Sequence, residues 1–220
     1  MISESRGSRF EQARAIVSEL LDHLNADYHY HCKNHTLGDV VPFAHKLCEL
    51  EQVSEEEAEL VLVASLFHDT GFLQQYSANE PMGCQNARTH LVSCGYTLDE
   101  IERVCDLIMA TVCPSGPGSQ TPGHDRLRRI LCDADLATLA LPSHLARAEA
   151  LRLEINAVGA ANGRQPVSVR SFFEAQVAVY RRHKYFTQSA RKLLGPGLER
   201  NRAEVLELLD IIDDEQSPNL

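Results

Sequence analysis

The 220-residue chain has no long run of apolar residues. No segment approaches the roughly 20 apolar residues that a membrane-spanning helix requires, so we expect no membrane partner. The first residues, Met1 to Arg9, also lack the apolar stretch of a secretory signal peptide. Together these absences predict a cytoplasmic protein.

Paired cysteine motifs are absent as well. The chain has an odd number of cysteines and no C-x-x-C arrangement, and the cysteines are Cys32, Cys48, Cys84, Cys94, Cys105, Cys113 and Cys132. This spacing does not support a zinc finger. It predicts reduced, mostly buried thiols in a reducing compartment.

Positive charge is in deficit. The 21 Lys and Arg residues are outnumbered by 31 Asp and Glu residues, which gives a net charge of −10. This balance argues against a surface that binds nucleic-acid polymers without sequence preference. It is compatible with a small anionic substrate, because a metal ion and a few local cations can hold a phosphate inside an acidic protein.

The chain also lacks a long linker rich in Gly, Ser or Pro, and it has no internal repeat. Its densest Pro/Gly stretch, Cys113 to Gly123, is short enough to be a loop. We therefore predict a single domain over residues 1–220, since this length supports one large core. The sequence specifies no oligomeric state, and a homodimer is the default by frequency alone.

No segment alternates apolar and polar residues as a strand does, whereas helical spacing recurs throughout. We predict an all-α fold with helical segments over about 10–24, 40–48, 54–67, 86–94, 97–109, 125–135, 171–180 and 198–212. Capping boxes are expected at Ser54 with Glu57, Thr97 with Glu100 and Ser171 with Glu174. Asp125 is expected to cap the helix that carries Asp133 and Asp135.

The pair His68-Asp69 is the most informative local feature. It ends an apolar stretch, Val61 to Phe67, and burying either polar side chain without a partner is costly. A neutral imidazole beside a carboxylate suits a divalent cation. The alternative is a hydrogen-bonded pair at a helix C-terminus, and His35 upstream and Asp135 downstream favour the metal.

Three segments around these residues resemble a known family signature. They are YHCKNHTL from Tyr30, ASLFHDTGF from Ala64 and ILCDADL from Ile130, and together they resemble the H…HD…D signature of the HD-domain metal-dependent phosphohydrolases. The likeness covers residues 25–195, with flanking N- and C-terminal helices. It implies a compact helical HD-domain bundle that binds a divalent metal and cleaves phosphomonoesters, phosphodiesters or nucleotide phosphates.

The resemblance also implies the ligand set: His35, His68, Asp69 and Asp135. Asp135 rather than Asp133 matches the motif because it directly precedes Leu136. Two residues apart on a helix, the two carboxylates point about 200° apart, so Asp133 is expected to face another element. The set suits one Mn²⁺, Mg²⁺, Fe²⁺, Co²⁺ or Ni²⁺ ion, and ligand type alone does not choose among them.

Further candidates are needed for proton transfer and for phosphate binding. Asp69 is expected to contact the attacking water, His31 to orient the phosphate or donate a proton, and Glu80 to act as the acid; His31 and Glu80 could instead be ordinary solvated residues. A second metal would need His90 and His124. Candidate cations for the phosphate are Arg88, Arg126, Arg128, Arg129, Arg181, Arg182 and Lys184.

The leading hypothesis is therefore a phosphohydrolase in which metal-activated water attacks a small phosphorylated substrate, with nucleotides and cyclic nucleotides among the candidates. One alternative is an HD-fold di-iron oxygenase. Another is a non-catalytic, metal-stabilised module that binds a nucleotide or a partner protein. Substrate identity lies in loops outside the signature and is not readable from it.

Overall fold

The regular elements of this chain are helices. A computed structural model describes residues 4–116 and 118–216, and within these ranges there is no strand, only an isolated bridge between Pro114 and Gly116. The α-helices are α1 Glu4–Leu21, α2 Val41–Glu51, α3 Glu55–Phe67, α4 Glu80–Leu91, α5 Leu98–Met109, α6 Arg126–Asp135, α7 His144–Ala161, α8 Val169–Arg182 and α9 Gln188–Gln216. Three short helical elements, η1 Asn34–Val40, η2 Thr70–Leu73 and η3 Ala137–Ala140, lie between them. The all-α prediction is confirmed.

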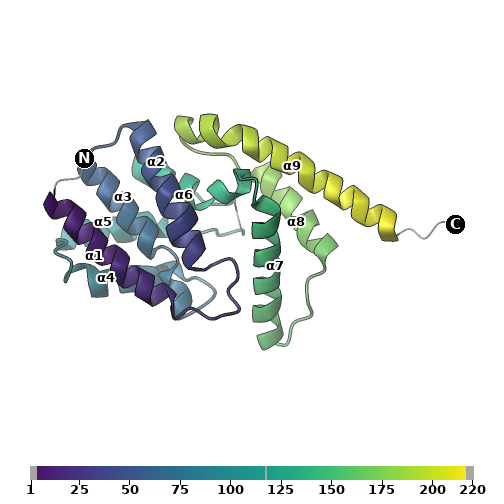
Figure 1. Cartoon of the computed structure of the whole chain (residues 1–220), viewed down its shortest axis with the longest axis horizontal. Coiled ribbons are helices and arrows are strands. Elements are labelled where there is room, and N and C mark those ends of the chain that lie inside the picture. Colours follow the sequence, from purple (N-terminus) through teal and green to yellow (C-terminus); the bar gives the residue numbers. More distant parts are fainter. Residues whose placement is uncertain (1–3, 117, 217–220) are drawn as a thin grey trace.

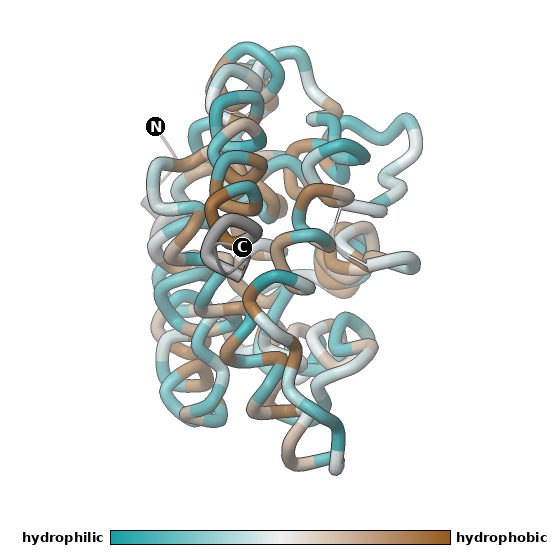
Figure 2. The backbone as a smooth tube through the Cα atoms, turned by 90° about the vertical axis from the view of Figure 1, so that its right-hand side faces the viewer, coloured by the Kyte–Doolittle hydropathy of each residue, from teal (hydrophilic) through white to brown (hydrophobic). Residues whose placement is uncertain are grey.

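The helices form two neighbouring groups. Figure 1 shows α1 to α6 gathered on one side and α7 with α8 on the other, while α9 runs along the top and extends away. Helix α9 packs against α2, α8 and η3, so it bridges the two groups. Hydrophobic and hydrophilic positions alternate along the helical turns in Figure 2, as amphipathic helices require.

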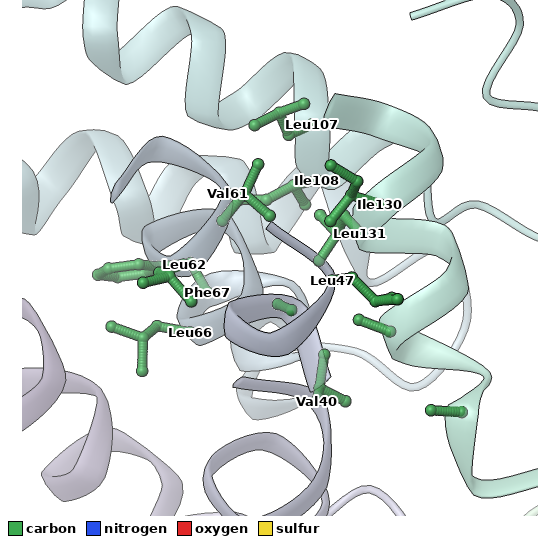
Figure 3. Close-up of a cluster of buried hydrophobic side chains, with 14 of the residues drawn as sticks. Val40, Leu47, Val61, Leu62, Leu66, Phe67, Leu107, Ile108, Ile130 and Leu131 are labelled. Atoms are coloured by element: carbon green, nitrogen blue, oxygen red, sulfur yellow. The ribbon is translucent and has the colours of Figure 1, made fainter. Parts of the chain in front are cut away.

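Helix α3 is the central element of the first group. Ser54 begins it with the predicted capping box, in which its side chain accepts from the N–H of Glu57. Residues 61–67 are all buried, and α3 packs against α1, α2, α5 and α6. Figure 3 shows side chains of α2, α3, α5 and α6 meeting around it. Since each fully buried large apolar side chain contributes roughly 1.5–3 kcal/mol, the end of α3 is firmly placed.

Other helix starts agree with the prediction in part. The capping box of Thr97 with Glu100 begins α5, and Asp125 caps α6 through the N–H groups of Leu127 and Arg128. The box predicted at Ser171 is wrong: Ser168 is the cap of α8, and it accepts a hydrogen bond from the N–H of Ser171. The chain enters this helix one turn earlier than its apolar spacing indicated.

The helices α1, α4 and α9 begin before their predicted ranges, and one helix has no predicted counterpart. Helix α7 was not predicted, although it consists largely of Ala, Leu, Arg and Glu, which favour helices. Helix α9 begins ten residues before the predicted segment and contains Pro196. The Gly-Pro-Gly sequence at 195–197 reads as a helix break, yet the helix continues through it. None of the helices in the described ranges combines the length and apolar composition needed to cross a bilayer.

Candidate metal centre

Three separate helical regions bring the predicted ligands together. His35 lies in η1, His68 caps the C-terminus of α3 and is followed by Asp69, and Asp135 is the last residue of α6. Element η1 packs against both α3 and α6, which explains the convergence. It has π-helical hydrogen bonding, a geometry that often occurs at functional sites.

The donor atoms are close enough to share one cation. One ligand atom each from His35, His68 and Asp135 lies within 4.8 Å of the others. Asp135 Oδ1 is 3.5 Å from the Nε2 atoms of His35 and of His68. Asp69 Oδ2 lies 3.6 Å from His35 Nε2 and 3.2 Å from His68 Nε2. Three side chains therefore form one close group, and Asp69 lies beside its two imidazoles.

Several of these donors are buried without a hydrogen-bond partner. His68 Nε2 and Asp69 Oδ2 are both unsatisfied, and the two residues are almost fully buried. Buried polar atoms nearly always have partners, so such orphans call for a ligand. Imidazole nitrogen and carboxylate oxygen are donors that divalent transition metals accept. The residues present thus fit a divalent cation.

The ring of His68 is fixed in the orientation that a metal ligand needs. Its Nδ1 donates to the carbonyl of Ser65 at 2.8 Å. This hydrogen bond occupies Nδ1 and directs Nε2 toward the other donors. The amide of Asn79 donates to the His68 carbonyl at 3.4 Å and supports the turn from the other side.

Asp135 has a partner that sequence reasoning missed. Gln120 donates from its Nε2 to Asp135 Oδ2 at 2.6 Å, which leaves Oδ1 for the imidazoles. Gln120 comes from the Pro/Gly-rich loop before α6, and no pattern in that loop points to it. A hydrogen bond of this kind orients a carboxylate and holds it in its charged form.

The charges of the cluster reinforce one another. Burial alone would lower the pKa of His68, but the carboxylates of Asp69 and Asp135 outweigh it, so the pKa lies well above the ordinary value. Burial would likewise raise the pKa of Asp135, but its close contacts with the imidazoles of His35 and His68 outweigh this and lower it. The site therefore keeps its carboxylates charged, as a cation site requires.

His31 is held by a buried carboxylate on a distant helix. Its Nδ1 lies 2.5 Å from Glu154 Oε1, and Glu154 also accepts from the backbone N–H groups of Tyr30 and His31. The His31 ring stacks on Phe72 at 4.2 Å between centroids. Burial lowers the pKa of His31, but its bond with Glu154 and the charge of Asp69 outweigh this and raise it. His31 is thus a fixed, readily protonated group and not a solvated one.

The two carboxylates of the cluster, Asp69 and Asp135, line a cavity of about 190 Å³ between the two groups of helices, and the imidazoles of His35 and His68 lie behind them. His31, Asp69, Glu80 and Asp135 line one end of it. Burial raises the pKa of Glu80, and the charges of Asp69 and Asp135 add to this, as a proton donor needs. The remaining lining residues are Tyr30, Phe72, Asn79, Thr111, Cys113, Leu136, Thr138, Leu139, His144, Arg147, Ala148, Leu151, Gln176 and Tyr180.

The cation at this cavity is Arg147, and none of the arginines and lysines that we had nominated lines it. Among those, Arg88 pairs with Glu102 and Arg128 with Asp106 on the surface of other helices. Arg147 comes from α7 and contacts Asp39 at 2.5 Å. We missed it because we had not predicted α7.

Asp133, His90 and His124 lie away from the donor cluster. Asp133 accepts hydrogen bonds from the N–H groups of Phe186 and Thr187 and from the Thr187 hydroxyl. It therefore fixes the chain just before α9, and it faces another element than Asp135 does, as predicted. His90 and His124 are not among the clustered donor residues, and the His124 ring contacts the guanidinium of Arg129 at 3.3 Å. The described residues thus bring together the four predicted donors without the two extra histidines.

No protein-family model and no curated protein matches this chain. Solved structures do match it. Bacillus subtilis YpgQ is 17% identical with a TM-score of 0.63, over 96% of this chain and 97% of that chain. YpgQ in complex with ADP gives 17% identity and a TM-score of 0.61, over 96% of each chain. A Lactobacillus plantarum protein is 19% identical with a TM-score of 0.65, over 98% of each chain. At these identities the similarity shows a shared fold, and it extends over nearly the whole chain.

Proposed function

We propose that this protein is a metal-dependent phosphohydrolase of the HD type that acts on a small phosphorylated molecule. The observation that carries the proposal is that donor atoms of His35, His68 and Asp135 lie within 4.8 Å of one another, with Asp69 beside the two imidazoles. His68 Nε2 and Asp69 Oδ2 have no hydrogen-bond partner, and Asp69 and Asp135 line one end of a cavity. The H…HD…D resemblance supports the same reading. A neighbour in fold, YpgQ, has been crystallised with ADP, which favours a nucleotide among small phosphorylated ligands.

The four donors would hold one divalent cation, which when bound would act as a Lewis acid toward a phosphoryl oxygen and the attacking water. Asp69 has an unpartnered Oδ2 and lines the cavity, so it can also orient that water. Arg147 lines the cavity and brings a guanidinium with five N–H donors to the phosphate; Asp39 and the amide oxygen of Asn34 hold it in place.

The leaving oxygen needs a proton, and two side chains can supply it. His31 is protonated readily and is held by Glu154, which fixes the direction in which its other ring nitrogen points. Glu80 lies at the same end of the cavity, and its raised pKa favours the protonated form. We assign His31 as the donor because its ring is clamped by both Glu154 and Phe72.

A reducing compartment such as the cytoplasm suits this protein. All seven cysteines are free, and Cys48, Cys84, Cys94, Cys105 and Cys132 are buried. Thiols of this kind persist where disulfides do not form.

The test is release of phosphate or pyrophosphate from a panel of nucleotides and aryl phosphates in the presence of Mn²⁺, Mg²⁺, Co²⁺ or Ni²⁺. We expect turnover that a chelator abolishes and that His68→Ala reduces at least 100-fold, because removal of a ligand disorders the whole centre. His45→Ala is the matched control, since His45 is an exposed histidine of α2. Metal binding without any product release would favour a non-catalytic module, and full activity of His68→Ala would refute the proposed site.

A further inference from the structure

The end of the cavity away from the metal ligands has a different chemistry. It is walled by residues of η3, α7 and α8, among them the apolar side chains Leu139, Ala148 and Leu151 and the ring of Tyr180. Two polar side chains, His144 and Gln176, interrupt this wall. An apolar pocket with a few polar groups is the usual form of a site for an organic ligand.

Gln176 is a buried amide without a hydrogen-bond partner. Its exposed fraction is 7%, it lines the cavity from α8, and no hydrogen bond of its side chain occurs within the described part of the chain. A carboxamide offers two N–H donors and one acceptor oxygen. Neither amide atom of Gln176 is among the fully buried unpartnered atoms, so its donors and its acceptor are accessible to a molecule in the cavity.

His144 lines the same end of the cavity, and its side chain also lacks a hydrogen-bond partner among the described residues. Its exposed fraction is 2%, and neither ring nitrogen has a hydrogen-bond partner in the described residues. Nε2 lies 3.7 Å from Glu204 Oε2 on α9, which is beyond hydrogen-bond distance. The His144 ring stands edge-on to Tyr180, with centroids 6.2 Å apart.

Tyr180 presents its ring rather than its hydroxyl. The hydroxyl donates to the carbonyl of Leu139 at 3.3 Å, which ties α8 to η3. Asn201 of α9 donates to the carbonyls of Leu139 and Leu141 at 2.8 Å each. The wall is therefore rigid, and the aromatic surface that it offers is fixed before a ligand binds.

One chain segment, residues 135–140, contributes lining residues to both ends of the cavity. Asp135 is followed directly by Leu136, which lines the cavity, and then by η3. Thr138 in η3 lies 3.1 Å from the hydroxyl of Tyr30, and the Tyr30 ring packs on His35 at 4.7 Å. A molecule with a phosphate at the metal ligands would thus extend its organic part toward α7 and α8.

We propose that this second end is a nucleobase subsite in which Gln176 reads the hydrogen-bonding edge of the base. The proposal rests on the proposed function for the phosphate end of the ligand. Adjacent donor and acceptor atoms of a carboxamide match the paired donor and acceptor on a base edge, as Gln does with adenine N6 and N7. The flat apolar faces of a base suit the Tyr180 ring and the leucine side chains.

Binding of free nucleosides tests the subsite separately from catalysis, because a nucleoside has no phosphate and needs no metal. Adenosine, guanosine, cytidine and uridine are titrated into the full chain, and binding is followed by NMR. Ribose 5-phosphate, which lacks a base, is the comparison ligand. We expect at least one nucleoside to bind, and Gln176→Leu to weaken it about tenfold, the effect of losing one good hydrogen bond. Gln85→Leu is the matched control, since Gln85 is an exposed glutamine of α4.

Two further measurements keep the proposal falsifiable if Gln176→Leu unfolds. Gln176→Glu keeps the shape but removes the amide donors, so the order of preference among nucleosides should change. With the unmodified protein, 8-azidoadenosine should photolabel peptides of α7 or α8. Equal binding by the wild type and both variants, binding of ribose 5-phosphate but of no nucleoside, or labelling elsewhere would overturn the subsite, whether or not the protein hydrolyses phosphates.

Discussion

Glu154 stays charged although its side chain is fully buried. Burial works to raise the pKa of Glu154, but the bonds from His31 and from two backbone N–H groups outweigh it, so the pKa is lowered. His183 differs from Glu154 because burial determines its pKa and favours the uncharged form. It is buried beside Tyr185, its Nε2 has no partner, and burial lowers the pKa of His183 to about 4. The one carboxylate that counteracts this shift is that of Asp135, and its effect is smaller.

The low pKa of His183 predicts a loss of stability in acid. In the unfolded chain His183 takes up a proton near pH 6.5, whereas in the folded chain it does so only near pH 4. The stability that neutral His183 contributes is therefore fully present above pH 6.5 and is lost as the pH falls from 6.5 to 4. The loss amounts to about 3 kcal/mol when the window is crossed. Urea unfolding at pH 7.5 and pH 4.5 in the presence of chelator measures it.

His183→Gln should reduce this pH-dependent loss, whatever its effect on stability at neutral pH. His45→Gln is the control, because His45 is exposed and its removal should leave the difference between the two pH values as it is in the wild type. An unchanged difference in His183→Gln would show that other groups govern the acid sensitivity.

At the scale of elements, the position of His68 and Asp69 depends on a close approach between the turn after α3 and the start of α4. A Cβ at Gly71 would overlap the carbonyl of Asn79 and lie 2.8 Å from the backbone nitrogen of Gly83. A Cβ at Gly83 would lie 2.8 Å from the carbonyl oxygen of Phe67. Glycine is required at both positions for steric reasons, since neither φ is positive.

We therefore expect Gly71→Ala to destabilise the protein by about 2–3 kcal/mol and to weaken metal binding, because overpacking would push α4 away from the ligand pair. Gly159→Ala is a matched change with the opposite expected sign. Its Cβ would lie within α7 at 3.6 Å from the Cβ of Arg164, an ordinary contact, so removal of a helical glycine should stabilise by roughly 0.5–1 kcal/mol. Chemical denaturation measures the free energy of unfolding of both variants. If Gly71→Ala were as stable as Gly159→Ala, the close approach between Gly71 and Asn79 would be contradicted.

At the scale of the whole molecule, the features that could be predicted from the sequence are those that depend on residue type and local spacing. The proximity of His35, His68 and Asp135 could be predicted because histidine and aspartate are unusual in apolar surroundings, and α3 could be predicted because Ser54 and Glu57 mark its start. That these residues bind a metal stays a prediction. The predicted segment 198–212 covers only the later part of α9, which begins at Gln188 and continues through Pro196 where it packs on η3.

The partners of the site residues could not be predicted in the same way. Glu154 meets His31 across more than a hundred residues of chain, and Arg147 and Gln176 reach the cavity only because α7 and α8 pack opposite the first group of helices. Charged and amide side chains on an amphipathic helix are ordinarily solvated, so residue type carried no signal. The helix-favouring composition of residues 144–161 was the one available clue.

The same long-range assembly predicts that a metal stabilises the entire fold. The donors come from η1, from the end of α3 and from the end of α6, so a cation that binds them ties together segments that are separate in the unfolded chain. With Mn²⁺ at about 100 times its Kd, we expect the free energy of unfolding to rise by about 2.7 kcal/mol, and Tm by about 5–10 °C for a chain of this size. His68→Ala should abolish the shift measured by calorimetry, while His90→Ala should retain it because His90 is not one of the clustered donors. Loss of the shift in His90→Ala would instead indicate a centre that needs a further histidine, as the di-iron alternative requires, and a shift that survives in His68→Ala would place the metal elsewhere.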